Sequence, residues 1–280
     1  MSFFSEILES LSEAWESVRE TFTENSVDSP VETCPLQNNE KAVSEKAMKR
    51  LQAAQEAINY TKGVFSHGAG NQIEALNSSK FNSYFRMKAA RNNKAFNIPE
   101  EVVILAQNNP EAFVAAKAEL SKGGNCGEHA YVVYDYLRRK YPDEHIQIAQ
   151  QEGFDHAFVI IGDPSKEGDN ELVVADAWPT DPTPVLWEDH FAYTSDKKKL
   201  LNHASSNGDS RDYKQEMFDA GLSFNDEGTK LTENSYDQKK TDEEIKSGKG
   251  KWIWEHPDTA ADTKYDYVTS RPLPDCGVNE

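Results

Sequence analysis

The sequence predicts an α+β protein whose helical N-terminal half packs on a small antiparallel sheet. Up to about residue 122, apolar residues recur at spacings of three and four, which is typical of amphipathic helices. Farther along, "HAFVIIG" (His156 to Gly162) and "ELVVADAW" (Glu171 to Trp178) are short and rich in β-branched and aromatic residues. The turn-forming run "DPSKEGDN" separates them, so we expect two neighbouring antiparallel strands.

Length and composition indicate one main core with polar appendages. The chain has 280 residues, only 37% of them hydrophobic, and its mean hydropathy is -0.76. We therefore predict three segments. An amphipathic helix and a linker cover residues 1–39, a folded core covers 40–195, and a polar, partly irregular C-terminal extension covers 196–280.

The expected helices follow one another through the first half of the chain. The first covers residues 4–22 and carries one apolar stripe, formed by Phe4, Leu8, Leu11, Trp15, Val18 and Phe22. This stripe either docks on the protein's own core or serves as a helix that binds a partner or chaperone. Further helices are expected over 40–59, 80–95 and 99–108, and from Pro110 to about 122, since proline suits a first helical turn.

The charge of the chain argues against two classes of partner. A formal net charge of -18 and a pI near 4.8 disfavour binding to nucleic acid or to an anionic membrane surface. A protein with a basic or neutral surface is the more compatible partner. The sequence contains no apolar run of about 18 residues, so no membrane span is expected.

The cysteines and the N-terminus indicate a reducing compartment. Cys34, Cys126 and Cys276 are odd in number and far apart, which fits neither a disulfide framework nor a thiolate zinc site. The first 20 residues lack a basic segment followed by an unbroken apolar one, so no cleaved signal peptide is expected. We expect a protein that is cytoplasmic as made, with secretion into a host cell by another route left open.

The stretch "SKGGNCGEHAYVVYDYLRR" (Ser121 to Arg139) places Cys126 at the start of an expected helix. A thiol attacks as the thiolate, and a helix N-terminus favours negative charge. The backbone N–H of Cys126 and the side-chain amide of Asn125 are candidate donors to an oxyanion, and Gly127 would let a substrate backbone approach. The alternative is a structural cysteine that happens to precede a helix.

A cysteine nucleophile needs an imidazole base and a group that orients this base. His156 opens one predicted strand and Asp176 ends the next, so both side chains can meet while facing the helix that carries Cys126. His129, three residues after Cys126, is an alternative base, or a metal ligand together with His156 and Asp176. No HExxH or paired-cysteine spacing supports a metal site, and neither a metal nor a cofactor is expected.

"GGNCGEHA", "DHAFVIIG" and "VVADAWP" together resemble the signatures of the transglutaminase-like and papain-like thiol enzyme superfamily. They are most similar to bacterial effector and toxin enzymes that deamidate, crosslink or cleave host proteins. The resemblance covers roughly residues 100–190 and implies a papain-like or transglutaminase-like catalytic core. Within that core, Cys126 corresponds to the nucleophile, His156 to the base and Asp176 to the orienting acid.

The resemblance implies a glutamine deamidase or transglutaminase that forms an acyl-cysteine intermediate on a host protein. A cysteine protease uses the same intermediate and remains an alternative. An arylamine N-acetyltransferase shares the chain length and the order Cys, His, Asp, although its cysteine motif begins with arginine where this chain has Lys122. A binding module without catalysis is the non-enzymatic alternative. Trp178 either helps to position substrate or packs in the core.

Overall fold

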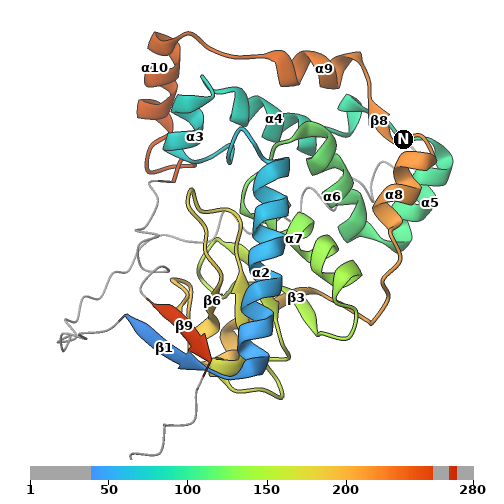
Figure 1. Ribbon diagram of the computed structural model, residues 1–280. Coiled ribbons are helices and arrows are strands. Elements are labelled where there is room, and N and C mark those ends of the chain that lie inside the picture. The colour runs from blue at the N-terminus through green and yellow to red at the C-terminus, as the bar shows by residue number, and fades with distance from the viewer. Residues whose placement is uncertain (1–38, 255–264, 270–280) are drawn as a thin grey trace, which may run out of the picture.

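In the computed structural model, which describes residues 39–254 and 265–269, helices and strands occupy separate regions (Figure 1). Most of the helices lie together at one end and the main sheet lies at the other, which confirms the predicted α+β class. The long helix α2 (Glu45–Val64) runs beside both regions. The expected helix over 4–22, with its partner site, lies outside the described residues, as do Cys34 and Cys276.

The main sheet has five antiparallel strands in the order β6-β5-β4-β3-β7. They are β3 (Ile146–Gln151), β4 (Ala157–Ile161), β5 (Val173–Ala175), β6 (Val185–Leu186) and β7 (Leu200–Ser205). The two predicted strands correspond to β4 and β5, and they pair antiparallel with Val159 opposite Ala175. The strands β3, β6 and β7 were not predicted.

Helix α2 and helix α7 (Cys126–Lys140) cover one face of this sheet. The core between them and the sheet is built from buried side chains such as Ile58 of α2, Leu137 of α7 and Val159 of β4. The opposite face carries a second cluster that includes Phe158 and Trp187. Alternate residues of β4 thus point into two cores, because successive side chains of a strand face opposite sides.

Helix α2 begins five residues later than expected. Ser44 is its N-cap and accepts a hydrogen bond from the backbone N–H of Ala47 at 2.9 Å. The preceding residues form strand β1 (Glu40–Val43), which pairs in parallel with β9 (Asp266–Thr269). This pairing joins segments more than 200 residues apart, so local sequence periodicity could not reveal it.

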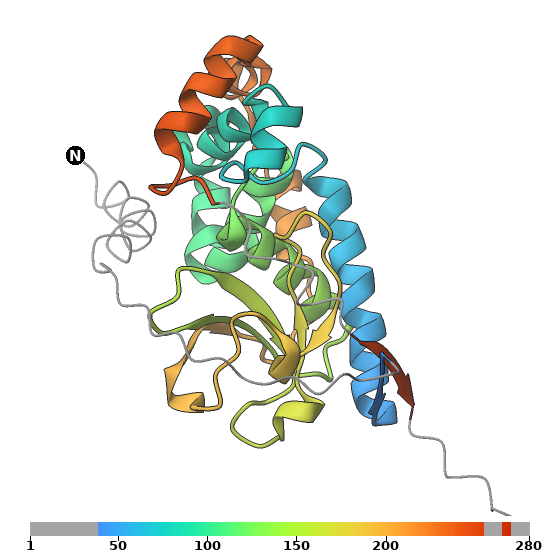
Figure 2. The ribbon, with the colours of Figure 1, turned by 90° about the vertical axis from the view of Figure 1, so that its left-hand side faces the viewer.

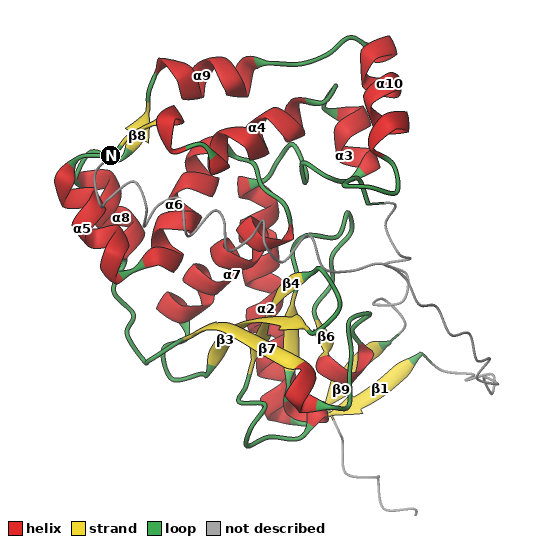
Figure 3. Cartoon of the chain, turned by 180° about the vertical axis from the view of Figure 1, so that it is seen from behind, coloured by secondary structure: helices red, strands yellow, loops and turns green. Residues whose placement is uncertain are grey.

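The helical region contains α3 (Ile73–Ser78), α4 (Asn82–Arg91), α5 (Glu100–Asn108) and α6 (Pro110–Ser121). Helices α5 and α6 lie where the sequence predicts them, and Pro110 occupies the first turn of α6. Helix α4 is shorter than the expected range 80–95, and the short strand β2 (Phe96–Asn97) follows it. Seen from behind, α4 to α6 and α7 form a continuous helical layer above the strands (Figure 3).

In the described residues from 196 to 254, where the sequence predicts a polar and partly irregular extension, the chain forms strands and helices that pack with the earlier elements. Strand β7 pairs with β3 in the main sheet, and β8 (Ser223–Phe224) pairs with β2. Three helices accompany these strands, namely α8 (Tyr213–Asp219), α9 (Asp226–Glu233) and α10 (Gln238–Gly248). Figure 2 shows α10, in orange, over the helical end of the molecule. Across the described part of the chain, no helix has the length and apolar character that crossing a membrane requires.

Candidate active site

Cys126 occupies the first turn of α7, as the sequence predicts. Asn125 is the N-cap residue, and its backbone N–H donates to Glu128 Oε2 at 2.7 Å. Glu128 is in turn held by Arg91, whose Nε donates to Oε1 at 2.7 Å. Cys126 keeps part of its surface exposed and is a free thiol. The cysteine therefore sits, accessible, where the helix dipole favours negative charge.

The two glycines before this turn serve close packing. A Cβ on Gly123 would lie 2.4 Å from the backbone carbonyl carbon of Arg86, so no larger residue fits without movement. The carbonyl of Gly124 accepts a hydrogen bond from the N–H of Gly70 at 3.0 Å. The "GG" pair thus holds the loop that leads into Cys126 against α4 and the 68–72 loop. Gly127 is buried in the first turn of α7.

The pairing of β4 with β5 brings His156 and Asp176 together. Continuing the register of Val159 opposite Ala175 past the strand ends places Asp176 one diagonal step from His156 on the same face. His156 Nε2 lies 2.5 Å from Asp176 Oδ2, and the two side chains are 1% and 5% exposed. This separation is that of a charge-assisted hydrogen bond.

The face that these two residues share differs from the expected one. His156 and Asp176 have the parity of Phe158, which packs in the cluster opposite α7, and the rings of His156 and Phe158 are 5.9 Å apart. From the sequence, both side chains were expected to face α7. The Cys126 thiol instead approaches the imidazole at the end of the sheet, where it helps to raise the pKa of His156.

The electrostatics favour a charged His156. Burial tends to lower its pKa, but the charge of Asp176, the hydrogen bond to Asp176 and the Cys126 thiol together raise the pKa to about 10. Burial likewise tends to raise the pKa of Asp176, yet the attraction and hydrogen bond of His156 hold that pKa well below its usual range. Since Nε2 of His156 is engaged by Asp176, Nδ1 is the ring nitrogen available to the thiol. The arrangement can support a thiolate–imidazolium pair.

Aromatic side chains surround the imidazole. The rings of Trp178 and Phe191 lie 4.9 Å and 5.0 Å from that of His156, and Trp254 lies 5.5 Å from Trp178. Trp178 is buried, and its backbone N–H donates to Asp176 Oδ1 at 3.0 Å. Trp178 therefore packs in the core, holds the carboxylate and shields the His156–Asp176 bond from water. A role in positioning substrate stays a prediction.

His129 has the surroundings of a structural histidine rather than of a base. Its Nδ1 hydrogen-bonds to the carbonyl of Asn125 at 2.7 Å, and its ring stacks on Phe65 with centroids 3.8 Å apart. Burial, reinforced by the charge of Lys62, lowers its pKa to about 4, so the ring is neutral at physiological pH. The structure brings His156, and not His129, between the thiol and Asp176.

His190 carries no recognisable sequence motif, yet the structure places it in the site. Its Nε2 lies 3.4 Å from Asp176 Oδ2, and the side chain is buried. His190 follows a short 3-10 turn (Trp187–Asp189), 14 residues beyond Asp176. No regular spacing links the two residues, so only the tertiary structure could reveal the contact.

Among the residues that the structure describes, His156, Asp176 and His190 form a group of potential metal ligands within 4.8 Å of one another. Two ligands of a tetrahedral zinc ion, with bonds of about 2.0–2.1 Å, lie about 3.3 Å apart. The 2.5 Å between His156 and Asp176 is shorter and corresponds to a direct hydrogen bond. The geometry fits a hydrogen-bonded relay better than a metal site.

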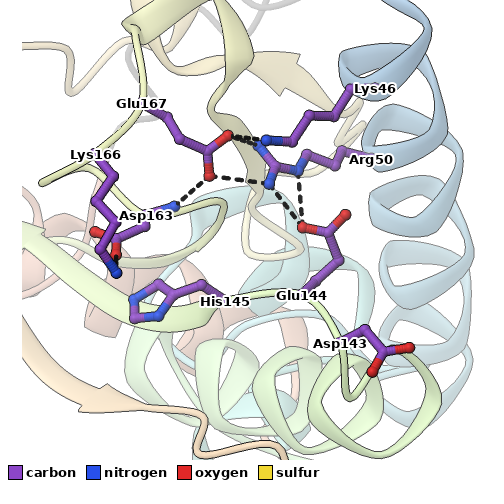
Figure 4. Close-up of a pocket in the computed structure, with 8 residues that line it drawn as sticks. All are labelled: Lys46, Arg50, Asp143, Glu144, His145, Asp163, Lys166 and Glu167. Atoms are coloured by element: carbon purple, nitrogen blue, oxygen red, sulfur yellow. Dashed lines mark hydrogen bonds and ion pairs between the residues drawn. The ribbon is translucent and has the colours of Figure 1, made fainter.

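A cavity of about 500 Å³ lies at the opposite end of β4 from His156 (Figure 4). Several of its charged groups pair with one another, and the buried guanidinium of Arg50 donates to Glu144 at 2.7 Å and to Glu167 at 2.9 Å. Figure 4 shows Lys46 on the same carboxylate of Glu167, from the same helix as Arg50. This network ties α2 to the loops at that end of the sheet, and we assign it a structural role.

No family model matches the chain, and no curated protein or solved structure is significantly similar to it. The function proposed below therefore depends on the residues of the site and their geometry.

Proposed function

We propose that this protein is a thiol enzyme that acts on amide groups of proteins through an acyl-cysteine intermediate. Cys126 is the nucleophile, His156 the general base and acid, and Asp176 the group that orients His156, within a papain-like or transglutaminase-like core. One observation carries the proposal. His156 is buried between a carboxylate at 2.5 Å and a partly exposed thiol at a helix N-terminus.

The chemistry would proceed in two halves. The Cys126 thiolate attacks the amide carbon, and the resulting oxyanion accepts hydrogen bonds from the backbone N–H of Cys126 and the side-chain amide of Asn125. The His156 imidazolium gives its Nδ1 proton to the nitrogen that leaves, which produces a thioester. A water, or a lysine amine of a second protein, then loses its proton to His156 and attacks the thioester, which frees Cys126.

The leaving and attacking groups decide which reaction results. Ammonia leaving and water attacking is glutamine deamidation, a lysine amine attacking is transglutamination, and a peptide amine leaving is proteolysis. The resemblance of the three motifs to effector deamidases favours glutamine as the substrate group. The net charge of -18 favours a folded protein substrate with a basic or neutral surface, attracted by electrostatic steering.

Intact-mass spectrometry can separate these reactions in one measurement. A panel of folded proteins with basic surfaces would be incubated with the wild type, with Cys126→Ala and with the control His203→Ala, which changes an exposed histidine of β7. We expect the mass change of amide-to-acid exchange or a joined species, present with the control and absent with Cys126→Ala. Fragments would instead identify a protease, and acetylation of Cys126 by acetyl-CoA would identify an acetyltransferase.

The three candidate residues should act as one unit. Cys126→Ala, His156→Ala and Asp176→Ala should each abolish most of the activity, and double variants should be little worse than single ones. Activity that survives in His156→Ala but not in His129→Ala would show that His129, and not His156, is the base. If Cys126→Ala left the biological effect of the protein intact, the protein would act as a binding module without catalysis.

A further inference from the structure

We infer that His190 is a positioning residue for Asp176. It acts as a neutral imidazole that carries its proton on Nε2 and donates it to the carboxylate. The inference rests on the proposed function, because Asp176 matters for catalysis only if His156 is the base. It adds a fourth residue to a site in which the sequence motifs indicate three.

The hydrogen bonds of His190 define its tautomer. The backbone N–H of Ala192 donates to Nδ1 at 3.3 Å, so Nδ1 presents a lone pair. The proton of the neutral ring is then on Nε2, which lies 3.4 Å from Asp176 Oδ2. An N–H facing a carboxylate oxygen is a donor, whereas the other tautomer would set two lone pairs against each other.

The surroundings of His190 fix the ring in this orientation. The side chain is 1% exposed, and its ring lies 4.3 Å from that of Phe191 and 4.7 Å from that of Phe158. The backbone N–H of His190 also donates to the carbonyl of Trp187 at 3.2 Å. The donor therefore cannot swing away from Asp176 without displacing packed aromatic rings.

Asp176 consequently accepts hydrogen bonds at both of its carboxylate oxygens. Trp178 donates its backbone N–H to Oδ1, while His156 and His190 both reach Oδ2. Such donors keep a buried carboxylate ionised and prevent its rotation. A fixed carboxylate fixes the plane of His156, and with it the direction in which Nδ1 faces Cys126.

A neutral donor suits this position better than a cation. A charged side chain beside Asp176 would compete with the imidazolium of His156 for the same oxygen. Burial lowers the pKa of His190, in contrast to the raised pKa of His156, so one imidazole is neutral while the other is charged. His156 thus donates to the Asp176 carboxylate as a cation, and His190 donates to the same carboxylate as a neutral ring.

The tautomer can be tested directly by NMR of the full-length protein with ¹⁵N-labelled histidine. His190→Gln assigns the His190 signals by their loss. We expect His190 to show a protonated Nε2 and an unprotonated Nδ1 throughout pH 6 to 8. A protonated Nδ1, or a doubly protonated ring in that range, would overturn the inference even if the protein proves to be a thiol enzyme.

The positioning role can be tested by the rate at which iodoacetamide labels Cys126 at pH 6, resolved by peptide mass spectrometry. A thiolate held by His156 is labelled at this pH, whereas an ordinary thiol is not. We expect His190→Leu to slow the labelling by about tenfold, as loss of a hydrogen bond to a charged group predicts. His190→Gln, which places an amide N–H near the position of Nε2, should recover most of the rate.

Two comparisons keep this test decisive. The control His203→Leu, on an exposed residue of β7, should leave the rate unchanged, and circular dichroism should show every variant folded. Equal labelling rates for the wild type and a folded His190→Leu would refute the positioning role of His190 and leave the proposed function untouched. If iodoacetamide labelled Cys126 of the wild type no faster than a free thiol, the proposed function would be refuted as well.

Discussion

Arg91 and Glu128 form a two-point ion pair beside Cys126, with Arg91 Nε 2.7 Å from Oε1 and Nη2 2.9 Å from Oε2. Glu128 also accepts the backbone N–H of Asn125, so one carboxylate joins α4 to the N-terminus of α7. As an acidic residue in the first turn of α7, Glu128 interacts favourably with the helix dipole. The structure adds a second function, which is to hold the turn that presents the thiol.

Replacement of Glu128 should therefore destabilise the protein more than an ordinary first-turn glutamate would. We expect Glu128→Ala to lower the free energy of unfolding by about 2 kcal/mol, mostly because the backbone N–H of Asn125 loses its hydrogen-bond acceptor. The ion pair contributes the smaller part, because the Arg91 side chain is 43% exposed and therefore screened. Urea unfolding measures the change.

The matched control is Glu101→Ala, which removes an exposed glutamate from the first turn of α5. It should change the free energy of unfolding by no more than about 0.5 kcal/mol. Equal effects of the two substitutions would show that Glu128 acts through the helix dipole alone.

The pKa of His156 predicts how stability depends on pH. A pKa of about 10 in the folded protein exceeds the ordinary value of 6.5, so the charged imidazole stabilises the fold. This contribution is complete below pH 6.5 and is lost as the pH rises through 10. The stability advantage of the wild type over His156→Gln should shrink steadily over that interval, as measured by urea unfolding at each pH. A constant difference would mean that His156 is neutral in the folded protein.

Gly123 should tolerate no side chain. In Gly123→Ala the new Cβ would lie 2.4 Å from two carbon atoms of Arg86, so we expect a loss of about 1–3 kcal/mol in the free energy of unfolding. Gly63, in α2, is the comparison, because a Cβ there would meet nothing within 4 Å. Gly63→Ala should stabilise the protein by up to about 1 kcal/mol, through helix propensity. Thermal unfolding of both variants checks the opposite signs.

The buried Lys214 tests whether the chain after residue 195 is integral to the core. This lysine of α8 forms an ion pair with Glu119 of α6 and lies 3.6 Å from Asp135 of α7. Lys214→Ala should cost about 3 kcal/mol or more, since it leaves buried carboxylate charge with less compensation. The exposed Lys230→Ala should have little effect. A loss of much less than this in the free energy of unfolding of Lys214→Ala would indicate that α8 contributes little to the stability of the core.

Features that depend on neighbouring residues were predicted well from the sequence. Pro110 opens α6 and Cys126 opens α7, because the first turn of a helix leaves backbone N–H groups free and imposes no partner on a proline. The β-branched runs that became β4 and β5 were likewise recognisable, and their antiparallel pairing followed from the short connection between them.

A local signal also existed for the start of α2, which was expected five residues too early. Ser44, followed by Glu45, is a favourable N-cap sequence, and it marks the observed start of α2 better than periodicity does. The apolar spacing continued across this cap, because Val43 of β1 is buried in the same core as the face of α2. Periodicity identifies which residues are buried, and it does not by itself locate the end of an element.

The sequence by itself determined that a cysteine begins a helix and that a histidine and an aspartate flank two paired strands. Only the tertiary structure decided that His156 meets the thiol at the end of the sheet, that His190 shares Asp176, and that β7 and β9 complete distant parts of the fold. The physical reason is the range of the interactions. Caps and strand propensity act within a few residues, whereas a buried hydrogen bond or a strand pair depends on how the whole core closes around it.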